Sequence, residues 1–246
     1  GNSITSTTGT ALNIANTNIG ASGVTLQSVS VNGAANGILL NTTGNSGGLT
    51  VTGTGGAGSG GTIQNTTGDG VVLNATTNPS LSFMNINNAA DSGITIDAVS
   101  GLNLVGLLMS SNGAQMEGGT IQDAGIHIED LIGTANAITD STIQDSRNSN
   151  LDWDPNSSSA MSLLTVTNSK LNHAGEGVAS QGNAGINLFA TGTANVKLVV
   201  SGGEIVNNAA AGIVITGDSN STVRSDIDGV NMVSSAPAVP SGTTGG

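Results

Sequence analysis

The chain has 246 residues, of which only 8% are charged, and its 16 acidic residues against 4 Lys and Arg give a net charge of −12. Such a chain offers no basic face to nucleic-acid phosphates or anionic lipid, and no apolar run approaches the roughly 20 residues that span a bilayer. The absence of cysteine excludes disulfides and thiolate metal sites. We therefore expect neither nucleic-acid binding nor membrane insertion, and a thin aliphatic core.

A degenerate repeat runs along the chain. Each copy has an apolar residue, a polar segment with Asn or Asp, and then a glycine followed by an apolar, any, apolar triplet. The copies occupy 29–40, 61–73, 84–96, 119–128, 170–188 and 203–215, with the glycine at Gly37, Gly70, Gly93, Gly125, Gly185 and Gly212. The apolar residue precedes the glycine by the same offset in 61–73, 84–96 and 203–215, so the copies share a register.

The long interval between Gly125 and Gly185 predicts a hidden copy. Asn150 follows Ile143 at the common offset and is followed by Leu151 and Trp153. Asn is the residue that, after Gly, best tolerates positive φ, so we expect it to replace the glycine. In this register Leu151 and Trp153 point into the core, and the intervening acidic side chains point outward.

A second apolar alternation precedes each polar segment. Alternation with period two over three to five residues indicates a short strand with one buried face. The alternations lie at 49–51, 81–83, 102–105, 163–166 and 197–200. Three short strands per unit, joined by turns, describe one coil of a solenoid in which each coil stacks on the next.

The predicted fold is thus all-β, a single-stranded parallel β-helix of about 8–9 coils over residues 1–235. A C-terminal linker rich in Pro, Gly, Ser and Thr is expected at 236–246. Polar residues that recur two positions after the apolar residue are expected to bond the turn backbone at one corner of each coil. They are Asn65, Asn88, Asp123, Asp145 and His173, with Asn207 and Asn208 in the last full coil.

The units with the pattern I-x-N-x(4)-G-I-x-I, together with the stretches 164–171 and 188–215, carry a family resemblance. They resemble the right-handed parallel β-helix repeats of large bacterial secreted and surface proteins, such as autotransporter passengers and adhesins, which share the pectate-lyase-like architecture. The resemblance implies the fold over nearly the whole chain. It leaves function open, because this solenoid carries lyases, glycosidases, adhesins, tailspikes and plain stalks.

Catalytic signatures of the related polysaccharide-cleaving enzymes are missing from the sequence. The chain has no Asp-Asp pair and no Gly-His-Gly segment. Its four basic residues are expected in different coils, at different points of the register; they are Arg147, Lys170, Lys197 and Arg224. We therefore expect a chain that is not an enzyme, and assign no catalytic or cofactor-binding residue.

Two places in the sequence carry residues of types that bind metal ions. Asp152, Asp154 and Asn156 alternate like the start of a calcium loop, but the glycine and later Glu of the EF-hand pattern do not follow. Strand alternation instead predicts a solvated acidic rim at Asp152 and Asp154. His127 and His173 are expected to be isolated surface side chains. No metal ligand is assigned, and calcium at the acidic rim is kept as an alternative.

No amphipathic helix is expected to cover either end of the solenoid, so exposed strand edges would favour end-to-end self-association or contact with neighbouring modules of a longer chain. The expected function is a non-catalytic structural or adhesive module at the bacterial cell surface or outside the cell, with a surface glycan or protein receptor as a further partner. The alternative is a carbohydrate-active β-helix that uses the inserts around 106–120, 152–160 and 173–184.

Overall fold

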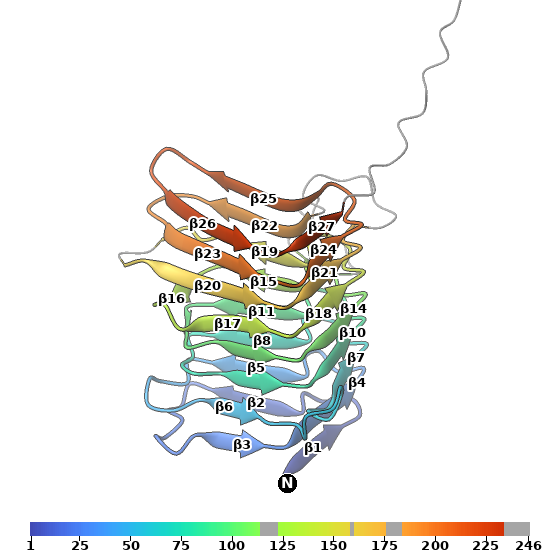
Figure 1. Cartoon of the computed structure of the whole chain (residues 1–246). Coiled ribbons are helices and arrows are strands. Elements are labelled where there is room, and N and C mark those ends of the chain that lie inside the picture. The colour runs from blue at the N-terminus through green and yellow to red at the C-terminus, as the bar shows by residue number, and fades with distance from the viewer. Residues whose placement is uncertain (114–122, 158–159, 176–183, 234–246) are drawn as a thin grey trace, which may run out of the picture.

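The computed structural model describes residues 1–113, 123–157, 160–175 and 184–233. In these ranges the chain forms 27 strands and no helix. Three long sheets, each entirely parallel, run the length of the molecule as a right-handed β-helix with three strands per coil (Figure 1). The predicted fold class is confirmed, and the expected linker at 236–246 lies outside the described residues.

The first sheet contains nine strands in chain order. They are β1 (Ser3–Ser6), β4 (Ser28–Asn32), β7 (Thr62–Gln64), β10 (Asn85–Asn87), β14 (Leu108–Ser110), β18 (Thr142–Gln144), β21 (Lys170–Asn172), β24 (Glu204–Val206) and β27 (Asn231–Val233). The central side chains of neighbouring strands stack in register, as in Ile63, Ile86 and Met109, which are fully buried. Buried apolar side chains stacked in this way build this wall of the core, and β4 contributes two of them, Val29 and Val31.

The second sheet contains eight strands and supplies two inward columns. They are β2 (Leu12–Ala15), β5 (Ile38–Asn41), β8 (Val71–Asn74), β11 (Ile94–Asp97), β15 (Ile126–Ile128), β19 (Leu151–Trp153), β22 (Ala184–Ala190) and β25 (Ala211–Gly217). Trp153 is 1% exposed and lies in register between Ile128 and Leu188. The predicted inward position of Trp153 is confirmed.

The third sheet also has eight strands. They are β3 (Val24–Leu26), β6 (Leu49–Val51), β9 (Ser80–Ser82), β13 (Asn103–Val105), β17 (Asn136–Thr139), β20 (Ser162–Thr167), β23 (Asn195–Ser201) and β26 (Thr222–Asp228). A two-stranded sheet, β12 (Val99–Ser100) and β16 (Leu131–Ile132), widens the two middle coils. The five second alternations of the sequence all overlap strands of the third sheet.

Four of the repeat glycines precede strands of the second sheet, whereas Gly185 and Gly212 are the second residues of β22 and β25. Except at Gly212, where the nearest atom to an added Cβ is 3.6 Å away, glycine is required by space rather than by dihedral angle. None of the six has positive φ. A Cβ on Gly125 would lie 2.5 Å from Ile143 Cγ2 and 2.6 Å from the Asn150 carbonyl oxygen. On Gly185 it would lie 2.3 Å from Ile205 Cγ2. The side chain of the first sheet fills the room beside the glycine.

Asn150 occupies the glycine position of its coil, as predicted, because Leu151 pairs with Ile126. The reason expected for this replacement is wrong, since Asn150 is not among the residues with positive φ. Its side chain is fully buried and donates from Nδ2 to the carbonyl of Asn172 (2.8 Å) and to Asn208 Oδ1 (3.3 Å). The amide thus binds the next two coils at this corner.

Positive φ is found instead at the corner that follows the first sheet. Six residues there share φ between 53° and 56°, namely Asn65, Asn88, Ser111, Asp145, His173 and Asn207. Their side chains partly stack, as where Asn88 Nδ2 donates to Asn65 Oδ1 (3.3 Å). The expected positions of the corner row are confirmed except at Asp123, whose place Ser111 takes. The expected bonding to the turn backbone is not found among the described residues of this row, because its hydrogen bonds run to other side chains.

The first half of the repeat copy expected at 119–128 is wrong, because an earlier segment forms the first-sheet strand of this coil. Met109 pairs with Ile86 on one side and Ile143 on the other, so it fills the column position expected of Ile121. Ile121 itself lies outside the described residues. Asn208 also differs from Asn207: it is buried inside the corner, where its Oδ1 accepts from the Ala174 amide (2.8 Å).

Candidate functional site

A His and two Asp residues meet on the outer face of the second sheet, at β15 and β19. Ile126 and Ile128 of β15 point into the core, as do Leu151 and Trp153 of β19, so alternation sends the residues between them to the other face. His127 and Asp152 are register partners. Adjacent parallel strands are about 4.8 Å apart, so the pairing brings the two side chains into contact.

Both side chains are buried, which overturns the expectation that they are surface groups. His127 is 6% exposed and Asp152 is 4% exposed. Alternation gives the direction of a side chain relative to the core, but not its exposure, which depends on the neighbouring coils. The expected solvated rim is therefore wrong for Asp152, and His127 is not an isolated surface histidine.

The carboxylate of Asp152 is held in a fixed orientation between two coils. Its Oδ1 accepts a hydrogen bond from Asn187 Nδ2 on β22 (2.7 Å), and its Oδ2 lies 3.7 Å from His127 Nδ1. The three residues occupy the same register position on β15, β19 and β22. The row thus places an amide, a carboxylate and an imidazole side by side along the solenoid axis.

Asp154 lies at the next outward position and lines a shallow pocket of about 240 Å³. The pocket is lined by His127, Glu129, Asp154, Asn156, Phe189 and Thr191. Asp154 is half-buried, whereas the Phe189 ring is 46% exposed at the rim. A polar floor beside an exposed aromatic ring is thereby formed by residues from three successive coils.

Burial and the neighbouring charges shift the pKa values of Asp154 and His127. Burial, reinforced by the negative charge of Asp152, raises the pKa of Asp154 from its usual 3.8 to about 6. For His127, burial alone would lower the pKa, but Asp152, Asp154 and Glu129 outweigh it, and the net shift is upward. Protons, or another cation, are therefore favoured in this cluster.

Two buried atoms of the cluster have no hydrogen-bond partner. They are His127 Nδ1 and Asp154 Oδ1. One ligand atom each of His127, Asp152 and Asp154 can be chosen so that all three lie within 4.8 Å of one another. The three side chains could hold a metal ion or the polar groups of a ligand.

Asn156, the third residue of the expected calcium alternation, lies at the edge of this pocket. Its backbone amide donates to Asp130 Oδ1 (3.4 Å). The contact of His127 with these acids was not predicted from the sequence. The signal was nevertheless present, because His127 follows Gly125, and Asp152 follows Asn150, by the same number of positions.

The second histidine lies elsewhere. His173 Nδ1 is 3.7 Å from Asp145 Oδ1 at the corner after the first sheet, and about a third of each side chain is exposed. Lys170 Nζ lies 3.8 Å from Glu204 Oε2 on the same sheet. The expectation that the basic residues occupy different register positions is wrong for Lys197 and Arg224, which are partners on β23 and β26.

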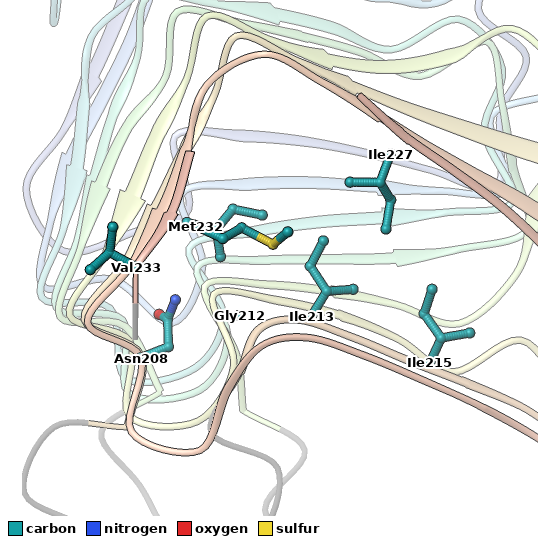
Figure 2. Close-up of a pocket in the computed structure, with 8 residues that line it drawn as sticks. Asn208, Gly212, Ile213, Ile215, Ile227, Met232 and Val233 are labelled. Carbon is teal, nitrogen blue, oxygen red and sulfur yellow. The ribbon is translucent and has the colours of Figure 1, made fainter. Parts of the chain in front are cut away.

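A second hollow, of about 480 Å³, lies at the C-terminal end of the solenoid. Figure 2 shows Ile213 and Ile215 from β25, Ile227 from β26 and Met232 from β27 around it. Met232 is 51% exposed and Val233 is 55% exposed. The side chains that would be covered by a following coil are open to solvent at this end.

Among the described residues, no helix is long and apolar enough to cross a membrane. Comparisons with protein-family profiles, with curated proteins and with solved structures find no match to this chain.

Proposed function

We propose that the chain is a non-catalytic structural module, a rigid β-helical stalk or filament element of a bacterial extracellular or cell-surface protein. The supporting observation is the unbroken stacking of coils. All three long sheets keep parallel pairing from the first coil to the last, around a continuous aliphatic core from Leu26 to Ile205. A solenoid with such continuity resists bending, because every coil is bonded to its neighbours on three sides.

The open C-terminal end supports a partner that continues the stack. Among the described residues, the strands β25, β26 and β27 are each paired on one edge only, and the apolar hollow lies among them. Covering Ile215, Ile227 and Met232 removes apolar surface from water and completes backbone hydrogen bonds. The proposed partner is a second copy stacked end to end, or a neighbouring module.

The test is the mass of the protein in solution, measured by light scattering after size exclusion over a range of concentrations. End-to-end stacking predicts a mass that rises with concentration. Val233→Asp places a charge on the end surface and should keep the protein monomeric. Ile132→Asp is the matched control, because Ile132 is equally exposed, at 55%, but lies on the side of the solenoid. A monomeric wild type at every concentration would exclude self-stacking.

The second candidate is a carbohydrate-active or glycan-binding β-helix, the alternative that the pocket at Asp154 favours. An exposed aromatic ring such as Phe189 beside hydrogen-bonding groups suits the apolar face and hydroxyls of a sugar. The charge there is negative, which disfavours uronic acids unless a cation is bound between them. Incubation with neutral and acidic polysaccharides, with and without calcium, decides the matter. If the wild type released new reducing ends and Asp154→Asn did not, the carbohydrate-active function would be preferred to the structural one.

A further inference from the structure

The cluster at β15 and β19 has the donor set of a metal centre. His127 offers an imidazole nitrogen, and Asp152 and Asp154 each offer a carboxylate oxygen. Imidazole with carboxylate suits Zn²⁺ and the neighbouring transition metals, whereas Ca²⁺ takes six to eight oxygen ligands. The described residues of the cluster provide too few oxygens for calcium, but enough mixed donors for zinc.

A second observation points to a ligand in the cluster. His127 is more than nine-tenths buried, and its Nδ1 faces Asp152 Oδ2 at 3.7 Å without a hydrogen-bond partner. A buried nitrogen left without a hydrogen-bond partner destabilises the folded state, so such atoms are rare in native structures and call for an explanation. Asp154 Oδ1 is also without a partner. Both atoms without a partner are therefore on residues of the cluster formed by His127, Asp152 and Asp154.

The support around the carboxylate also fits metal binding. Asn187 Nδ2 donates to Asp152 Oδ1 and leaves Oδ2 turned toward His127. Ligating carboxylates are commonly held in this way by an outer hydrogen bond, which fixes the direction of the free oxygen. The orientation of Asp152 is thus set by the neighbouring coil before any ion is bound.

We propose that His127, Asp152 and Asp154 together bind one divalent transition-metal ion of the Zn²⁺ class. Metal–nitrogen and metal–oxygen bonds of about 2.0–2.2 Å place tetrahedral ligand atoms about 3.3 Å apart. The His127–Asp152 separation of 3.7 Å is already close to this value, and the longest separation in the set is within 4.8 Å. Small side-chain rotations, chiefly at half-buried Asp154, close the remaining distance.

The charge of the cluster also favours binding of a divalent cation. Two carboxylates and Glu129 lie around a single imidazole, and burial makes uncompensated negative charge costly. A divalent cation neutralises Asp152 and Asp154 and accepts the lone pair of neutral His127.

Three protein ligands leave a coordination position open. Two of the proposed ligands, His127 and Asp154, line the neighbouring pocket, which has room for a further group beside the ion. Water, or an oxygen donor of a small ligand, would take that position, as in metal sites that bind exogenous groups.

The test uses the full chain freed of metal with a chelator and titrated with Co²⁺, whose visible absorption reports its ligands, and with Zn²⁺ by calorimetry. One ion per chain is expected. His127→Gln and Asp154→Asn should each weaken Zn²⁺ binding at least about tenfold. His173→Gln is the matched control, because His173 is also 3.7 Å from a carboxylate but, among the described residues, belongs to no group of three potential metal ligands. This control should bind within about twofold of the wild type.

Far-UV circular dichroism and Trp153 emission establish that each variant is folded. Asp154→Asn should disturb folding less than His127→Gln, because Asp154 is only half-buried. Zinc affinity unchanged by both His127→Gln and Asp154→Asn would overturn the proposal. So would the absence of saturable Co²⁺ absorption in the wild type, or a preference for Ca²⁺ over Zn²⁺.

Discussion

His127 and Asp152 are direct neighbours on adjacent coils, with Nδ1 3.7 Å from Oδ2, although β15 and β19 are separated in the sequence by three other strands, β16, β17 and β18. Their proximity follows from the pairing of Ile126 with Leu151. In a solenoid, a site on the outer face is assembled from residues one coil apart.

The carboxyl of Asp154 should make the stability of the fold depend on pH. Its pKa is near 3.8 when exposed and about 6 in the folded protein, so the folded state binds the proton more tightly. The stabilisation is therefore complete below about pH 4 and is lost as the pH rises through 6. The loss should be about 1 to 2 kcal/mol, discounted for the solvent that reaches this half-buried group.

Asp154→Asn should flatten that dependence and raise the free energy of unfolding at pH 7 to 8, in metal-free buffer. Urea denaturation of both proteins at pH 4, 6 and 8 measures it. The raised pKa of His127 acts in the same direction, because its protonated form also loses population as the pH rises. A variant and wild type that differ equally at all three pH values would contradict the assignment.

Trp153 should be the most costly core residue to truncate. It is 1% exposed and the largest fully buried side chain, so Trp153→Ala should destabilise the fold by about 3 to 5 kcal/mol. Trp153→Phe should cost less, because the indole Nε1 has no hydrogen-bond partner to lose. Chemical denaturation followed by far-UV circular dichroism compares the two, and an emission maximum of exposed indole in the native wild type would contradict the burial.

Gly125→Ala should destabilise the fold by about 1 to 3 kcal/mol through overpacking. The added methyl would lie 2.5 Å from Ile143 Cγ2 and 2.6 Å from a carbonyl oxygen of the next coil. Gly20→Ala is the control, since nothing lies within 4 Å of the Cβ position and φ is not positive. Thermal unfolding should give a lower melting temperature for Gly125→Ala than for Gly20→Ala. Equal melting temperatures would contradict the prediction, because they would mean that the residues around Gly125 move to accommodate the methyl group without loss of stability.

Asn150→Ala should cost about 1 to 3 kcal/mol, because it leaves the carbonyl of Asn172 without its donor in a buried corner. Asn150→Gly recreates the residue found at this position in other coils, and it loses the same bond. Denaturant unfolding of both variants is the measurement. If either variant matched the wild type, the amide would not bind the coils together.

Much of the fold could be predicted from the sequence, because stacked coils repeat the same spacing between their apolar residue and their glycine. The common offset between Ile and Gly located Asn150 and Trp153 correctly. The physical reason for the glycine was not readable, because the conflict with Ile143 or Ile205 arises only after the first and second sheets meet at the corner.

The candidate site was predicted less well for a related reason. Alternation correctly sent His127, Asp152 and Asp154 to the outer face, but exposure depends on what neighbouring coils place beside them. Judging each residue within its own strand left His127 isolated. Aligning the copies by Gly125 and Asn150 would have joined it to Asp152. Met109 was missed because its segment lacks the glycine at the usual distance.

The Asn150 side chain also has a mechanical consequence. Through Asn208 it connects the corner before β19 with the corner before β25, so three successive coils share one hydrogen-bonded core of amides. If a pulling force peels coils from the C-terminal end, the β25 coil cannot leave without breaking bonds that also hold the two coils beneath it. Unzipping under load should therefore proceed here in one step of several coils rather than coil by coil.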